Sequence, residues 1–349
     1  QEASYFKFKN DLLEQFKSTA HLKFKTNKQN STLINFLNGT LEVSSKGVKL
    51  REFSKEDYLS YQLKFKYDPD SEMPLFNKFI NEILPDRNLQ DILAEYLGSI
   101  FIKKNVLQIE KVLLLYGTGS NGKSVLFDII ENLLGKHNMT NYGLKKLTTC
   151  PNTRAKIEHK LLNYSSEIDE IGDFNTFKQL VSREPVDAKI LYKDVYTIDD
   201  YSRLMFNCND LPSKNEITKG YFRRFLIIPF EAYIPEHKQD KNLAQKIISK
   251  ELSAIFNWVL VGMDRLLKHK NFTKSSKVIV SLAGGDSCIS FCFLVSSSFC
   301  SCASTVASST FSNKNPGLFS LCPAWIKSVV PAVSQLSFSR FIIFRSFSA

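Results

Sequence analysis

Cysteine is scarce over most of this chain of 349 residues: up to Lys277 it occurs only as Cys150 and Cys208. Two isolated cysteines cannot build the disulfide framework of a small secreted domain, so we expect a reducing, cytoplasmic compartment. The same part has no run of about 18 unbroken apolar residues and no charged-then-apolar leader. We therefore expect no association with a membrane.

Acidic residues are also in deficit. The chain has 46 Lys and Arg against 35 Asp and Glu, which gives a net charge of +11. Such a balance favours a polyanionic partner, although many basic proteins bind nothing of that kind. The length suits one large domain or two to three smaller ones, and Gln1 in place of Met indicates a fragment or a processed product.

The last part of the chain, residues 279–349, lacks charge and periodicity. It contains five charged residues, and the other five cysteines lie there among serine and phenylalanine clusters. The cysteine spacing is poor for zinc, and the serine density argues against a membrane anchor. We interpret this segment as an atypical tail, from an out-of-frame translation or a fusion, rather than as a domain.

A glycine-rich turn follows an apolar run within residues 113–135 and leads into a helical pattern. It matches G-x-x-x-x-G-K-[ST] at every fixed position. The glycines let backbone N–H groups surround phosphates, Lys123 reaches the β- and γ-phosphates, and the Ser124 hydroxyl binds Mg²⁺. A buried strand before it and a helix from about Lys123 to Leu134 after it favour ATP and Mg²⁺ binding over a chance turn. The predicted nucleotide-binding residues are Gly117, Thr118, Gly119, Ser120, Asn121, Gly122, Lys123 and Ser124.

A second apolar run, "KLLNYSSEID", ends in carboxylates. A hydrolase needs such groups to hold the metal and to orient the attacking water. On an extended chain, Glu167 and Asp169 point to the same side, so we predict that they are the catalytic and metal-binding carboxylates. The pattern does not separate their roles, and without the glycine-rich turn a solvated acidic turn would be the simpler interpretation.

Two further runs carry candidate catalytic groups. "RLMFNCNDLP" is an apolar strand that ends in Asn209, whose amide can position the lytic water. "GYFRRFLIIPF" places Arg223 and Arg224 just before another strand, where one guanidinium could stabilise transition-state charge at a neighbouring subunit's γ-phosphate. On spacing alone, two surface arginines are the simpler interpretation.

The remaining patterns indicate a mixed architecture. Apolar residues recur at spacings of three and four over residues 73–86, 88–104 and 242–268, which predicts helices. An amphipathic helix is also compatible with "YFKFKNDLLEQFK", and Asn38-Gly39 predicts a short hairpin. Strands that alternate with helices predict an α/β core with a mostly parallel sheet.

The order of these motifs resembles that of superfamily 3 helicases. More narrowly, residues 38–277 resemble the helicase part of phage and plasmid primase-helicases, which are related to the poxvirus nucleoside triphosphatase. The resemblance implies an AAA+ P-loop NTPase core over residues 96–235, a mainly helical domain over 1–95 and a helical segment over 236–278. It also implies a ring hexamer with ATP between subunits, in which Asn209 is the sensor and Arg223 or Arg224 acts in trans.

The segment "FKQLVSREPVDAKILYKDVY" resembles the family's element that carries a hairpin into the central channel. The resemblance makes Lys189 and Lys193 candidates for gripping the DNA backbone, because lysine neutralises phosphate without reading sequence. A solvated basic loop is the alternative. The family usually has a Gly-Asp pair where this chain has Arg183 and Glu184.

The expected function is ATP-dependent translocation on single-stranded DNA in phage or plasmid replication, with a primase domain or other replication proteins as further partners. Two alternatives stay open. One is a P-loop phosphotransferase or ATPase that acts on a small acceptor. The other is a truncated remnant that cannot form rings, which the unusual tail suggests.

Overall fold

The computed structural model describes residues 6–19, 31–44, 47–168, 171–209 and 223–275. Every described residue belongs to one compact unit of the chain, Gln1–Gly285. Asp169 and the tail predicted over residues 279–349 lie outside the described residues.

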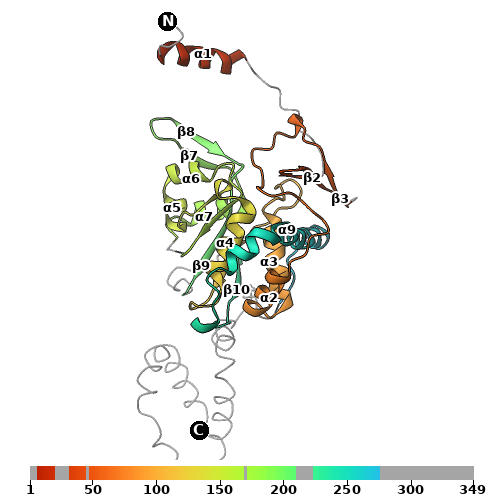
Figure 1. The fold of residues 1–349 in the computed structure, drawn as a ribbon. Helices are drawn as coiled ribbons and strands as arrows, with labels where there is room; N and C mark the ends of the chain where they lie inside the picture. The colour runs from red at the N-terminus through yellow and green to blue at the C-terminus, as the bar shows by residue number, and fades with distance from the viewer. Residues whose placement is uncertain (1–5, 20–30, 45–46, 169–170, 210–222, 276–349) are drawn as a thin grey trace, which may run out of the picture. The chain divides into compact units, whose positions relative to one another are not determined.

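Helices and strands alternate through the described chain (Figure 1). Their order is α1 (Phe6–Thr19), β1 (Thr32–Phe36), β2 (Gly39–Ser44), β3 (Gly47–Arg51), α2 (Pro74–Ile83), α3 (Arg87–Ser99), β4 (Val112–Tyr116), α4 (Lys123–Leu134), β5 (Met139–Thr140), α5 (Leu144–Thr149), α6 (Pro151–Ile157), β6 (Leu162–Ser165), α7 (Phe174–Ser182), β7 (Val186–Lys189), β8 (Val195–Ile198), β9 (Arg203–Cys208), β10 (Phe225–Pro229) and α9 (Leu243–His269). Short 3₁₀ turns occur at η2 (Lys55–Asp57), η3 (Lys136–Asn138) and η5 (Glu236–Lys238).

The central sheet has five parallel strands in the order β10-β4-β9-β6-β5. This confirms the prediction of an α/β protein with a parallel sheet, and β4, β6, β9 and β10 coincide with the four apolar runs. Strand β5 was not predicted, because two residues are too few to carry a periodicity. Since all strands run the same way, the carboxyl ends of β4, β6 and β9 meet at one edge of the sheet.

Hydrophobic cores lie on both faces of this sheet, as a buried parallel strand requires. Along β4, Val112 and Leu114 join the cluster formed with α5, α6 and α7. Leu113 and Leu115 join the cluster formed with α2, α3, α4 and α9. Figure 1 shows α5, α6 and α7 on one side of the sheet and α3, α4 and α9 on the other.

The amino-terminal part, predicted as a mainly helical domain over residues 1–95, contains strands as well as helices. The predicted helix is present as α1, but it buries no residue. The hairpin predicted at Asn38-Gly39 belongs to an antiparallel sheet of three strands, β1-β2-β3. The helical spacing of α2 and α3 dominates the pattern, whereas these strands are only five or six residues long.

Helix α3 crosses the boundary predicted after residue 95 and packs closely along α9. A Cβ atom on Gly262 of α9 would lie 2.4 Å from the carbonyl carbon of Ala94 in α3, so only glycine allows this approach. The core cluster on the α2, α3, α4 and α9 side of the sheet runs from Ile34 to Leu266, so α2, α3 and α9 share a core with the sheet.

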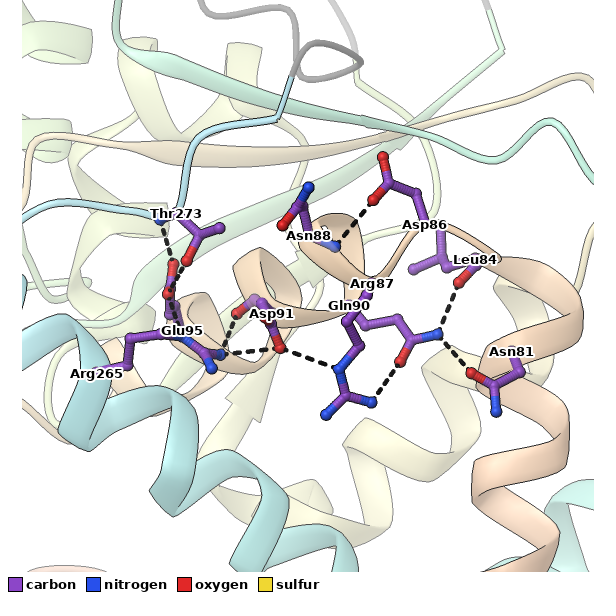
Figure 2. Close-up of polar contacts among 10 residues, drawn as sticks. All are labelled: Asn81, Leu84, Asp86, Arg87, Asn88, Gln90, Asp91, Glu95, Arg265 and Thr273. Atoms are coloured by element: carbon purple, nitrogen blue, oxygen red, sulfur yellow. Dashed lines mark hydrogen bonds and ion pairs between the residues drawn. The ribbon is translucent and has the colours of Figure 1, made fainter.

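A polar network on α3 ties it to both neighbouring helices (Figure 2). The Gln90 amide donates to Asn81 Oδ1 and to the Leu84 carbonyl oxygen at the end of α2, both at 2.8 Å. On the side toward α9, the fully buried Glu95 carboxylate accepts from Arg265 Nε at 2.6 Å and from the Thr273 N–H at 2.7 Å. The network fixes α2 and α9 relative to one another. No helix in the described part of the chain combines the length and apolar character that a bilayer crossing needs.

Candidate active site

The glycine-rich loop joins β4 to α4 at the carboxyl edge of the sheet, as predicted. The Gly117 N–H donates to the Cys208 carbonyl oxygen at 3.0 Å, and the Phe230 N–H donates to the Tyr116 carbonyl oxygen at 2.7 Å. These bonds fix the start of the loop between β9 and the residue after β10.

The end of the loop requires glycine twice over. Gly122 has φ 82°, in the left-handed region, and a Cβ atom there would lie 2.6 Å from Ile83 Cγ2. Ile83 is the last residue of α2, so α2 packs directly on the turn that begins α4. A helix amino terminus with free N–H groups at this point is a site suited to phosphate.

Lys123, the first residue of α4, is 7% exposed, and its ammonium group donates to the Gly117 carbonyl oxygen within the same loop. Burial lowers its pKa from the usual value. A phosphate oxygen would offer a charged acceptor in place of this neutral carbonyl, and charge-assisted hydrogen bonds are the stronger ones.

A cavity of about 620 Å³ opens at the loop. Pockets for small molecules and cofactors occupy about 300–1,000 Å³, so the volume suits a nucleotide. Six predicted loop residues line the cavity, and Gly117 and Thr118 do not. The six are Gly119, Ser120, Asn121, Gly122, Lys123 and Ser124.

The ends of β6 and β9 supply the next wall. Ser166, Asn207 and Asn209 line the cavity, so the structure brings the predicted Asn209 together with the loop. Asn207 was missed, although a polar residue within an apolar run is a signal. Its Oδ1 accepts a hydrogen bond from the buried Tyr164 hydroxyl at 2.8 Å, and burial raises the pKa of that phenol.

The predicted carboxylates are not all brought to the cavity. Glu167 is exposed and does not line it; it follows Ser166 in a bend, where strand alternation has ended after Ser165. The prediction that Glu167 and Asp169 point to the same side assumed an extended strand, and the chain is no longer a strand at Glu167. Asp169 lies outside the described residues.

Within the described ranges, no group of three or more His, Cys, Asp or Glu side chains could hold an ion. Mg²⁺ in nucleotide sites uses one or two protein ligands together with phosphate oxygens and water. The Ser124 hydroxyl in the cavity and the Glu167 carboxylate after β6 are oxygen ligands of the type that Mg²⁺ uses.

The opposite wall was not predicted. It comes from α2, which contributes Leu75, Lys78, Phe79 and Glu82, and from the segment between Ile234 and Lys246. That segment brings Lys238, Lys241, Leu243 and Lys246 to the cavity. Lys246 pairs with Asp240 at 2.6 Å, whereas the side chains of Lys78, Lys238 and Lys241 have no ion pair or hydrogen bond with any described residue. The cavity is therefore rich in cationic groups, as a polyanion requires.

Arg223 and Arg224 lie away from this cavity. The Val112 N–H, at the start of β4, donates to the Arg224 carbonyl oxygen at 2.8 Å, so both arginines lie at the amino edge of the sheet. Arg223 is exposed, and Arg224 is 8% exposed. The Lys111 ammonium donates to the Arg223 carbonyl oxygen, and burial together with both arginine charges lowers the pKa of Lys111.

The predicted hairpin is present as the antiparallel pair β7 and β8. Lys189 is the last residue of β7, Lys193 lies in the connecting turn, and both are exposed. The structure thus separates three places: a cavity at the carboxyl edge, an arginine edge opposite it, and an exposed basic hairpin.

Two family models match the chain. One, described as "D5 N terminal like", matches residues 6–85, and the other, described as "Family of unknown function (DUF5906)", matches residues 115–224. Each covers less than half of the chain. The second begins at the end of β4 and reaches Arg224, so it includes the glycine-rich loop, β6 and β9.

Curated relatives match a longer part. The chain is 27% identical over 268 residues to "Putative helicase 184R" of Invertebrate iridescent virus 6, which covers 67% of this chain and 27% of that protein. It is 25% identical over 258 residues to "Putative helicase L207/L206" of Acanthamoeba polyphaga mimivirus, covering 70% of this chain and 26% of that protein. The chain spans about a quarter of the length of these relatives.

A solved structure, "The apo structure of NrS-1 C terminal region (305-718)", aligns with 71% of this chain and 73% of that one. Its TM-score is 0.45 at 12% identity, which is too low to support an argument about fold or function. The chain is thus similar, over about two thirds of its length, to viral proteins that are named as helicases.

Proposed function

We propose that this chain is the motor part of an ATP-dependent DNA helicase that serves the replication of a virus, phage or plasmid. The observation that carries the proposal is the cavity in which the glycine-rich loop, buried Lys123 and the strand-end amide of Asn209 meet. The similarity to viral proteins named as helicases supports the reaction class. The parallel sheet, with the loop strand β4 between β10 and β9, supports an AAA+ core of the superfamily 3 type.

Each group then has a role in the proposed reaction. The loop N–H groups and Lys123 hold the β- and γ-phosphates, and Ser124 with Glu167 and Asp169 would hold Mg²⁺. When bound, Mg²⁺ would neutralise charge on the phosphate oxygens. Asn209 positions the attacking water, and one of the two carboxylates takes its proton.

We infer a ring of identical subunits, and the positions of the two edges support it. Strand β10 separates Arg223 from the cavity edge by five residues, or about 16 Å of extended chain. A copy therefore cannot place its own Arg223 at its own γ-phosphate, whereas a head-to-tail neighbour could supply it. Repeated head-to-tail contacts form a ring when the rotation between neighbours closes. Arg223, being exposed, is the better candidate for this finger than the buried Arg224.

Translocation requires contacts to DNA that ignore sequence. Lys189 and Lys193 on the β7–β8 hairpin are exposed and can neutralise backbone phosphates. We propose that they grip one strand as nucleotide hydrolysis moves the hairpin.

The test is ATP hydrolysis with and without single-stranded DNA, together with strand displacement. Stimulation by DNA is expected for the wild type, and Lys123→Ala should abolish both activities while Lys250→Ala, an exposed lysine outside the cavity, retains them. Unchanged activity in Lys123→Ala would refute the proposal. Hydrolysis by a monomer without any effect of DNA would indicate a small acceptor, and a permanent monomer without hydrolysis would indicate a remnant.

A further inference from the structure

The β7–β8 hairpin has a buried base and an exposed tip. Near its base, Val186, Ala188 and Ile198 are at most 4% exposed and pack in the core on one face of the sheet. At the tip, Leu191 is 64% exposed and Tyr192 is 95% exposed. The hairpin therefore carries apolar side chains outward from an anchored base.

Polar contacts hold the base in place. The Arg154 guanidinium, 7% exposed on α6, donates from Nε to the Asp187 carbonyl oxygen at 2.5 Å. The Tyr196 hydroxyl on β8 donates to Glu158 Oε2 at 2.7 Å. Both strands are thus fixed to α6 or to the residue after it, so the tip is presented by a rigid support.

The tip holds Tyr192 in an unfavourable backbone conformation. Its φ is 61°, in the left-handed region that aromatic residues rarely adopt. The Lys193 N–H donates to the Ile190 carbonyl oxygen at 3.0 Å and closes the turn. Strain of this kind persists where the surrounding structure enforces it, and it is concentrated at ligand contacts.

The chemistry around the tyrosine indicates what it meets. Lys189 and Lys193, both exposed, flank the apolar tip, and Asp194 next to Lys193 is exposed as well. Two positive charges against one negative leave the tip cationic, so a polyanion with apolar faces is complementary to it. Unpaired nucleobases on a phosphate backbone have that combination, and their faces stack on aromatic rings without regard to sequence.

We propose that Tyr192 stacks on an unpaired base of the bound strand while Lys189 and Lys193 hold the flanking phosphates. This inference rests on the proposed function, because it names the contact through which the hairpin grips DNA. Contacts to phosphates alone would let the strand slide along the hairpin, whereas stacking on a base would hold the strand at one nucleotide at a time. Tyr192 is thereby a DNA-binding residue that neither the motif order nor the lysines had indicated.

The experiment compares an oligothymidine with an abasic oligonucleotide of equal length by fluorescence anisotropy, at several salt concentrations. The wild type should bind oligothymidine about tenfold or more tightly than the abasic strand. Tyr192→Ala should lose that preference and leave abasic binding unchanged, whereas Tyr192→Phe should retain it. Tyr58→Ala is the matched control, since Tyr58 is also exposed, at 49%, with φ 48°.

Charge and stacking separate in the same titration. Lys189→Ala and Lys193→Ala should weaken binding of both oligonucleotides and make the affinity depend less steeply on salt concentration. Tyr192→Ala should leave the slope of that salt dependence unchanged. Equal wild-type affinity for the two strands, or equal weakening of both by Tyr192→Ala, overturns the inference and leaves the helicase proposal standing. Failure of the wild type to bind either strand overturns both.

Discussion

The carboxylate of Glu251 on α9 caps the amino terminus of the distant helix α2, and its removal should loosen the nucleotide cavity. Glu251 lies on α9 and is 4% exposed. Its two oxygens accept from the N–H groups of Leu75 at 3.0 Å and Phe76 at 2.8 Å, in the first turn of α2. The N-cap residue Met73 provides no side-chain cap, so Glu251 supplies it from a distant segment.

The magnitude follows from these two bonds. Glu251→Ala leaves two N–H groups without their acceptor, one of them on the buried Phe76, and removes a negative charge from a helix amino terminus. Hydrogen bonds to charged groups contribute about 1.5–3 kcal/mol each, and we expect a loss of about 3 kcal/mol in the free energy of unfolding. At about 2–4 °C per kcal/mol for a unit of this size, Tm should fall by about 6–12 °C.

The assay is thermal and urea unfolding, with nucleotide affinity measured in parallel. Affinity should fall as well, because α2 carries Leu75, Lys78 and Phe79 into the cavity. Asp264→Ala is the control on the same helix: its ion pair with Lys268 is exposed and should contribute less than about 1 kcal/mol. A Tm shift for Glu251→Ala no larger than that of Asp264→Ala would refute the reasoning.

Two further changes test the site. Arg223→Ala should lower kcat for ATP hydrolysis about 10³-fold with nearly unchanged nucleotide affinity, whereas Arg224→Ala, at a buried position, should mainly lower Tm; the reverse pattern in hydrolysis and melting would contradict the assignment. Tyr164→Phe removes the 2.8 Å hydrogen bond to Asn207, so we expect about 1 kcal/mol of lost stability and a lower kcat with little change in KM. An unchanged kcat in steady-state kinetics would show that Asn207 needs no such support.

The features that the sequence predicted well depend on local chemistry. The apolar run before the glycine-rich loop, the glycines themselves and the helical spacing after Lys123 each constrain a few neighbouring residues. The helix α4 accordingly begins and ends where expected, and Gly135 follows it with φ 84°. Strands β4, β6, β9 and β10 were recognisable because buried parallel strands are continuously apolar.

The features that were missed depend on contacts between distant segments. Nothing near Lys78 or Lys241 in the sequence indicates a nucleotide cavity, because α2 and the start of α9 meet there only after folding. Glu251 reads as one more polar residue of an amphipathic helix until its two partners, 176 and 175 residues away, are known. Helix α1 shows the converse: its spacing predicts a buried face, yet it buries none.

Arg183, which stands where the resembling family usually has glycine, is explained by its local backbone together with contacts to distant segments. The resemblance places a glycine there, and the structure gives Arg183 the left-handed backbone that glycine favours, with φ 52° at the end of α7. Such a conformation costs an arginine about 1–2 kcal/mol. The side chain donates to the carbonyl oxygens of Ile102 at 3.5 Å and Tyr201 at 3.2 Å, while its buried Nε has no partner among the described residues. The substitution therefore ties the end of α7 to the segment after α3 and to the approach to β9. Because β7 begins three residues later at Val186, the hairpin that carries Tyr192 starts from a fixed point where a glycine would have left a hinge.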